Sequence, residues 1–178
     1  WRSQKHAGGR DEGRVQEAGL GVRGGGGVGS LARSGRCTVC PVFADILKRL
    51  GRERAWAVHG SAGEAGGMDE LSTIGDTTLF DTAPNPVSSP VQPGSLGIKP
   101  AEISELQGGE ATENGEIITA ILEGNDKGPK RDIVMLNCAA GLVITGLEPD
   151  LQAGLARANE VIDSGAALEV LRKWQNFS

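Results

Sequence analysis

Aromatic residues are scarce in this chain. It contains no tyrosine, and phenylalanine and tryptophan together make up only 3% of its 178 residues. Proteins that bind single-stranded nucleic acid stack bases on aromatic side chains, so this composition argues against that function. The sequence also lacks any apolar run near the ~18 residues of a membrane-spanning helix. We therefore expect neither a nucleic-acid partner nor a membrane partner.

Histidine and cysteine are also few, with two and three residues. They do not assemble into a Ser-His-acid or Cys-His catalytic arrangement. Cys37 and Cys40 form a CxxC motif, but a structural zinc site needs four ligands, so we interpret the motif as a coincidence. Cys138 has apolar neighbours and is expected in the core. Three cysteines without a disulfide-rich pattern fit a reducing compartment, and we expect a cytoplasmic protein.

Glycine, by contrast, is abundant, with 28 residues. Residues 1–40 hold eleven of these glycines, together with seven basic and three acidic residues, a net charge of +4. The whole chain carries −5, so the remainder carries −9. The first forty residues show no apolar periodicity, which predicts little ordered structure. We expect residues 1–40 to be a Gly/Arg-rich leader, disordered or aberrant, and residues 41–178 to be the folded part.

Apolar periodicity after residue 40 predicts an α/β fold. Helical spacing is found over residues 41–50, 112–123, 131–145, 151–162 and 166–174. Short strands are expected over residues 55–60 and 77–80. Prolines crowd residues 82–100 and predict a loop or an edge connection there. Few strands and many helices together predict an incomplete sheet flanked by helices.

Two adjacent acids are the main candidate for chemistry. Residues 59–71 read HGSAGEAGGMDEL, in which four glycines precede Asp69 and Glu70. Mg²⁺ is commonly held by one or two carboxylates, and ligands of α/β proteins bind beyond the carboxyl ends of strands. Acids are equally favoured at a helix N-terminus, where they interact with the helix dipole. The spacing alone leaves both interpretations open.

From about residue 41 onward, the chain resembles the anthranilate phosphoribosyltransferase family. The matching segments are RAWAVHG (54–60), GMDELSTIG (67–75), LQGGEATENGEII (106–118), GPKRDIVMLNCAAGL (128–142) and VIDSGAAL (161–168). Their order and spacing also fit the family. The resemblance covers about three-quarters of the chain.

This resemblance implies a fold and a reaction. The fold would be the C-terminal part of the phosphoribosyltransferase and nucleoside phosphorylase α/β domain. The family transfers the 5-phosphoribosyl group of phosphoribosyl pyrophosphate (PRPP) to anthranilate in tryptophan biosynthesis, and pyrophosphate is released. The family uses Mg²⁺, and its adjacent metal-binding acids align with Asp69 and Glu70, which favours the metal interpretation. The loop before these acids is longer than in most relatives.

The sequence also departs from the family. The GTGGD-type PRPP loop, the NxST-type segment, the arginine that binds anthranilate and the helical N-terminal domain used for homodimerisation are not found in it. Lys5 with His6 weakly matches the KHGN-type motif, which implies a substrate-binding role for Lys5. No catalytic residue is identified in this fragment. We expect a truncated, catalytically incomplete form behind an aberrant leader.

Two alternatives belong to different classes. The chain could be a non-catalytic fragment or binding module, because an incomplete sheet exposes edges and apolar helix faces. It could also be a relative of the pyrimidine nucleoside phosphorylases, which share the architecture. The segments GMDELSTIG and ENGEII favour the anthranilate branch over the second alternative.

Overall fold

The protein forms a mixed sheet with helices on both faces. The computed structural model describes residues 22–24, 27–33, 39–87 and 89–177. The five strands are β1 (Val22–Gly24), β2 (Gly27–Arg33), β3 (Arg54–Ser61), β4 (Gly67–Met68) and β5 (Thr77–Asp81). The helices are α1 (Cys40–Arg49), α2 (Ala111–Leu122), α3 (Pro129–Ile144), α4 (Leu151–Asp163) and α5 (Ala166–Gln175), with short 3₁₀ turns η2 (Gly63–Ala65), η3 (Pro93–Leu96) and η4 (Ile103–Leu106).

Strand β3 is the centre of the sheet. β2 pairs with it in parallel, and β5 pairs with it antiparallel from Trp56↔Asp81 to Gly60↔Thr77. The short β4 pairs with the last two residues of β3, on the edge opposite β5. Residues 55–58 are buried without alternation, as expected for a strand covered on both faces.

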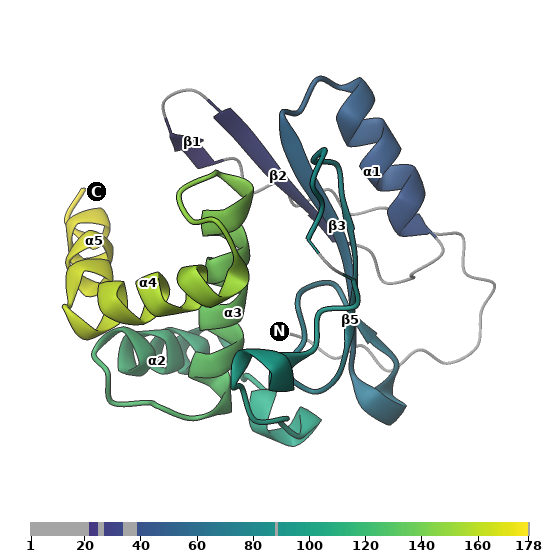
Figure 1. Cartoon of the computed structure of the whole chain (residues 1–178). Coiled ribbons are helices and arrows are strands. Elements are labelled where there is room, and N and C mark those ends of the chain that lie inside the picture. The colour runs from purple at the N-terminus through teal and green to yellow at the C-terminus, as the bar shows by residue number, and fades with distance from the viewer. Residues whose placement is uncertain (1–21, 25–26, 34–38, 88, 178) are drawn as a thin grey trace.

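The helices form two layers around this sheet. Figure 1 shows α1 on one side and α2, α3, α4 and α5 gathered on the other. The main core lies between β3, β5 and this second group; it includes Trp56, Val58, Leu79, Met135, Leu136, Val143, Leu155 and Ile162. Helices α3 and α4 cross closely at Gly154. A Cβ at this position would lie only 2.9 Å from the carbonyl oxygen of Ala139.

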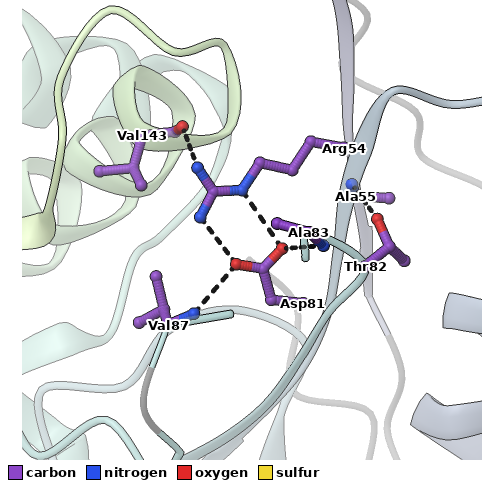
Figure 2. A network of polar contacts seen from close by, with 7 residues as sticks. All are labelled: Arg54, Ala55, Asp81, Thr82, Ala83, Val87 and Val143. Carbon is purple, nitrogen blue, oxygen red and sulfur yellow. Dashed lines mark hydrogen bonds and ion pairs between the residues drawn. The ribbon is translucent and has the colours of Figure 1, made fainter. Parts of the chain in front are cut away.

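A polar network ties the sheet to the helical layer (Figure 2). The guanidinium of Arg54 donates to both carboxylate oxygens of Asp81, at 3.2 and 2.7 Å, and to the carbonyl of Val143 at 2.9 Å. The same carboxylate accepts the backbone N–H groups of Ala83 and Val87. Arg54 also lies over the Trp56 ring, 5.5 Å from its centroid. The Arg54–Asp81 pair thereby joins β3, β5, the following loop and the end of α3.

The predicted fold class and most predicted elements are confirmed. The five helices and the two strands lie where periodicity predicted them, within a few residues. The proline-rich segment is a loop that contains η3 and a single bridge between Thr77 and Val91. In the part of the chain that the structure describes, no helix is long and apolar enough to cross a membrane.

Two segments before residue 40 differ from the expectation. Residues 22–24 and 27–33 are strands, although the sequence predicted little ordered structure there. Glycine disfavours strands in isolation, but five residues of β2 pair with the buried β3, and this tertiary pairing outweighs the local preference. The rest of residues 1–40, apart from Val39 and Cys40, lies outside the described residues.

One prediction of burial is wrong, and part of the apolar pattern of α1 faces outward. Val42, Ile46 and Leu50 recur at helical spacing, but they are exposed. Helix α1 packs on the sheet through the opposite face, where Cys40 is buried. Cys138, which was expected in the core, is also exposed, because it lies on a side of α3 that its packing partners leave uncovered.

Candidate metal-binding loop

The two candidate acids follow a hairpin at the end of β3. The chain leaves β3 at Ser61, turns through η2 and returns as β4. Asp69 and Glu70 come directly after β4, on irregular backbone that leads to β5. The helix N-terminus interpretation is therefore wrong. Since neither acid is in a strand, the strand rule that sends neighbouring side chains to opposite faces does not apply.

The hairpin explains the glycines around the acids. A Cβ on Gly60 would overlap the carbonyl oxygen of Glu70, and a Cβ on Gly67 would overlap the His59 ring. Gly63 and Gly66 have φ angles of 61° and 105°, which side chains disfavour. The glycines thus allow a tight turn and let the acidic segment lie directly against the end of β3.

Ser72 fixes the segment downstream of the acids. Its hydroxyl donates to the carbonyl of Ser61 and accepts the N–H groups of Ile74 and Gly75. Its own N–H donates to the Thr77 hydroxyl at 2.9 Å. Ser72 is buried. The turn after the acids is therefore joined to both neighbouring strands.

Asn137 on α3 holds the residue that follows Glu70. Its Oδ1 accepts the N–H of Leu71 at 3.0 Å, and its Nδ2 donates to the carbonyl of Leu71 at 3.0 Å. Leu71 is fully buried in the core. The acidic segment is consequently attached to the helical layer as well as to the sheet.

A cavity of about 320 Å³ opens beside the loop. Glu70 and Met68 line it together with apolar residues of η4, α2 and α3, and Lys130 contributes a basic group. Asp69 and Glu70 are both half-buried. A larger hollow of about 700 Å³ lies between α1 and β5, but neither acid lines it. We therefore place the candidate site at the loop rather than at the larger hollow.

The donor set at the loop is small. Across the described residues, no group of three or more His, Cys, Asp or Glu could hold a metal ion. Asp69 and Glu70 would be two hard oxygen donors, which suits Mg²⁺ with its remaining positions filled by water and phosphate. Lys5, the predicted substrate-binding residue, lies outside the described residues, as do His6 and Cys37.

Sequence reasoning found the acids but missed the residues that hold them. Asn137 is a polar residue inside an apolar helix, in the segment MLNCAAG, and that contrast was the available signal. Its partner Leu71 is 66 residues away, so the contact was invisible to local patterns. Ser72 carried no signal that distinguishes it from other serines.

Comparison with known proteins decides the family. Residues 36–168 match the a/b domain of a glycosyl transferase family. The chain belongs to this family. The match includes the hairpin, both acids, Ser72 and Asn137, so the whole candidate site lies within the family domain.

Curated relatives of the chain include anthranilate phosphoribosyltransferases, which confirms the predicted resemblance. The protein of Rhodospirillum rubrum is 44% identical over 132 residues, which are 74% of this chain and 37% of the relative. That of Geotalea uraniireducens is 44% identical over 74% of this chain and 36% of its own length. The chain thus spans little more than a third of the length of these relatives.

Solved structures support the same family fold. Anthranilate phosphoribosyltransferase from Thermus thermophilus superposes with a TM-score of 0.71 at 31% identity, over 80% of this chain and 40% of that chain. The Saccharomyces cerevisiae enzyme in complex with PRPP and Mg has a TM-score of 0.70 at 24% identity, over 81% of this chain and 41% of its own. The latter likeness concerns the fold alone.

Proposed function

We propose that this chain is part of an anthranilate phosphoribosyltransferase and that Asp69 and Glu70 bind Mg²⁺ for PRPP. One observation carries the proposal. Two adjacent carboxylates lie on irregular backbone beside the carboxyl end of β3, near the edge of the sheet where α/β proteins bind ligands. The family match includes this segment.

The residues present fit the ion. Carboxylates are the ligands that Mg²⁺ prefers, and one or two of them suffice when substrate phosphates and water complete the coordination. When bound, the ion would offset negative charge on the departing pyrophosphate. Asp69 and Glu70 would hold it, and the anchored backbone around them would reduce the reorganisation needed in the transition state.

The proposed reaction is a substitution at C1 of the ribose. The amino nitrogen of anthranilate forms the new bond to C1, the bond from C1 to the pyrophosphate oxygen breaks, and the amine loses a proton. Positioning of the two substrates supplies much of the acceleration in such reactions. The residues of this loop contribute by orienting one end of PRPP.

Several finer expectations remain part of the proposal. Lys5 would contact substrate, and the protein would act in the cytoplasm. Because the GTGGD-type and NxST-type segments are not found in the sequence, we propose that the 178-residue chain binds PRPP and Mg²⁺ without measurable turnover. That outcome would also be expected of a non-catalytic binding module.

The test is a titration of the purified chain with Mn²⁺, a paramagnetic substitute for Mg²⁺, in the presence and absence of PRPP. We expect saturable binding that PRPP strengthens, and Asp69→Asn should weaken it at least tenfold because one of two anionic donors is lost. Glu64→Gln is the matched control, since Glu64 is an exposed carboxylate in η2 of the same hairpin.

The outcomes separate the interpretations. Binding that Asp69→Asn leaves unchanged, or that Glu64→Gln weakens equally, would contradict the site. Phosphorolysis of a pyrimidine nucleoside by the chain would favour the phosphorylase alternative. Release of pyrophosphate from PRPP only with anthranilate would show that the chain is active by itself.

A further inference from the structure

The peptide group that links Glu70 to Leu71 is held from two sides. Its N–H, on Leu71, donates to Oδ1 of Asn137 on α3. Its carbonyl, on Glu70, lies so close to Gly60 of β3 that a Cβ there would overlap it. A peptide group is planar, and its N–H and C=O point in opposite directions. Helix α3 and strand β3 therefore fix the orientation of this one plane.

Asn137 uses its whole amide for this task. Besides the two bonds to Leu71, its Nδ2 donates to the carbonyl of Ile133, one turn earlier in α3, at 3.0 Å. Asparagine is a weaker helix former than alanine, and a half-buried amide requires hydrogen-bond partners. Three bonds of 3.0 Å satisfy it and set the side chain in one orientation.

The geometry matters for the neighbouring acids. The Glu70–Leu71 peptide plane sets the backbone dihedrals on either side of it, and these determine where the Glu70 side chain begins. Asp69 is one residue further, next to the paired β4. Ser72 fixes the other end of the segment. Through Asn137, the helical layer thus holds the backbone that sets the position of the two carboxylates.

We propose that Asn137 is a positioning residue for the metal-binding acids Asp69 and Glu70. This inference rests on the proposed function, because it assigns Asn137 to the same metal site. Asn137 itself does not bind the ion or the substrates. It acts by holding the backbone of Leu71, so that both carboxylates are in place before the ion arrives.

The test combines two measurements on the full chain. Amide hydrogen exchange at Leu71, measured by NMR without metal, reports directly on the hydrogen bond from the Leu71 N–H to Asn137. Mn²⁺ titration reports its effect on the acids. We expect Asn137→Ala to speed Leu71 exchange at least tenfold and to weaken Mn²⁺ binding at least threefold.

Asn159→Ala is the matched control. Asn159 on α4 makes the same kind of bond one turn back, from Nδ2 to the Leu155 carbonyl at 3.0 Å, and it also bonds a residue of another segment, Arg131. Its loss should leave Mn²⁺ binding unchanged. It should also leave the exchange rate of the Leu71 amide unchanged when that rate is compared with the rates of β3 amides. If circular dichroism shows that Asn137→Ala does not fold, Asn137→Leu replaces it. That variant keeps a side chain of similar size and is a stronger helix former, but it loses both the acceptor and the donor, so Leu71 exchange should still rise.

The results distinguish the two proposals. Failure of the parent chain to bind Mn²⁺ would overturn the metal site, and this inference with it. Mn²⁺ binding that Asn137→Ala and Asn159→Ala leave equally strong would overturn the inference alone. Unchanged Leu71 exchange in the Asn137 variant would also overturn the inference alone, because Asn137 would then not hold the backbone of Leu71.

Discussion

At the scale of single residues, some glycines in this protein are required by packing and others are not. Gly60 lies where backbone from another segment passes directly over it, and no side chain fits. Gly115, in the exposed part of α2, has nothing within 4 Å of an added Cβ. The first position requires glycine because of packing. The second carries only the entropic cost of a flexible backbone.

Gly60→Ala should therefore destabilise the protein and disturb the acids. A methyl group against the Glu70 carbonyl forces the segment away from β3, and such overpacking costs about 1–3 kcal/mol. Gly115→Ala should instead stabilise the protein by about 0.5–1 kcal/mol. Urea denaturation gives the free energies of unfolding. Equal effects of the same sign would contradict the close approach at Gly60.

At the scale of elements, the Arg54–Asp81 network adds directional hydrogen bonds to the hydrophobic contact between the sheet and the helical layer. The Asp81 side chain is fully buried, whereas Arg54 keeps 22% exposure. Burial by itself would raise the pKa of the Asp81 carboxyl. Hydrogen bonds from Arg54 and from two backbone N–H groups outweigh this effect, and the pKa lies below its ordinary value of 3.8.

This lowered pKa predicts how stability depends on pH. The carboxylate contributes its full stabilisation above the unfolded pKa of 3.8, and the contribution is lost as the pH falls through the lower folded value. Asp81→Asn should reduce the free energy of unfolding at pH 7 by about 2–3 kcal/mol, since one partner of a buried pair is neutralised. It should also flatten the decline of stability below about pH 4.

The measurement is denaturation by urea at pH 7 and at pH 3. Glu160→Gln, which removes an exposed ion pair with Arg157 on α4, is the control. Exposed pairs contribute little, so this variant should follow the parent at both values of pH. An Asp81→Asn variant as stable as the parent at pH 7 would contradict a structural role for the network.

Elements also show how far the sequence could predict this molecule. Helices α2, α3 and α4 and strand β3 were predictable because their apolar spacing reflects contacts with a single core. β2 was not, because its glycine-rich residues become a strand only through pairing with β3. Likewise, the acids were visible as neighbours in the sequence, but the Asn137 contact joins residues 66 apart and depends on the tertiary fold.

At the scale of the whole molecule, apolar side chains remain exposed on the outer face of α1. Val42, Ile46 and Leu50 are 57%, 44% and 66% exposed and recur at helical spacing. Contiguous apolar surface of this kind favours association. The purified chain should therefore form oligomers as its concentration rises.

The double variant Val42→Gln with Ile46→Gln should weaken this self-association without lowering the free energy of unfolding, because neither side chain is buried in the folded chain. Sedimentation velocity over a concentration series is the measurement. Lys48→Gln, at an exposed position of the same helix, is the control and should associate like the parent. A parent chain that stays monomeric at every concentration would contradict this expectation.

The anchoring of Leu71 and Ser72 has a practical consequence for protein engineering. Both anchors lie downstream of Asp69 and Glu70, whereas η2 lies upstream and is exposed. The exposed tip of the hairpin therefore lies outside these two anchoring contacts. A fluorescent label at Glu64 or Ala65 should report the arrival of a ligand nearby while it leaves the bonds of Leu71 and Ser72 in place.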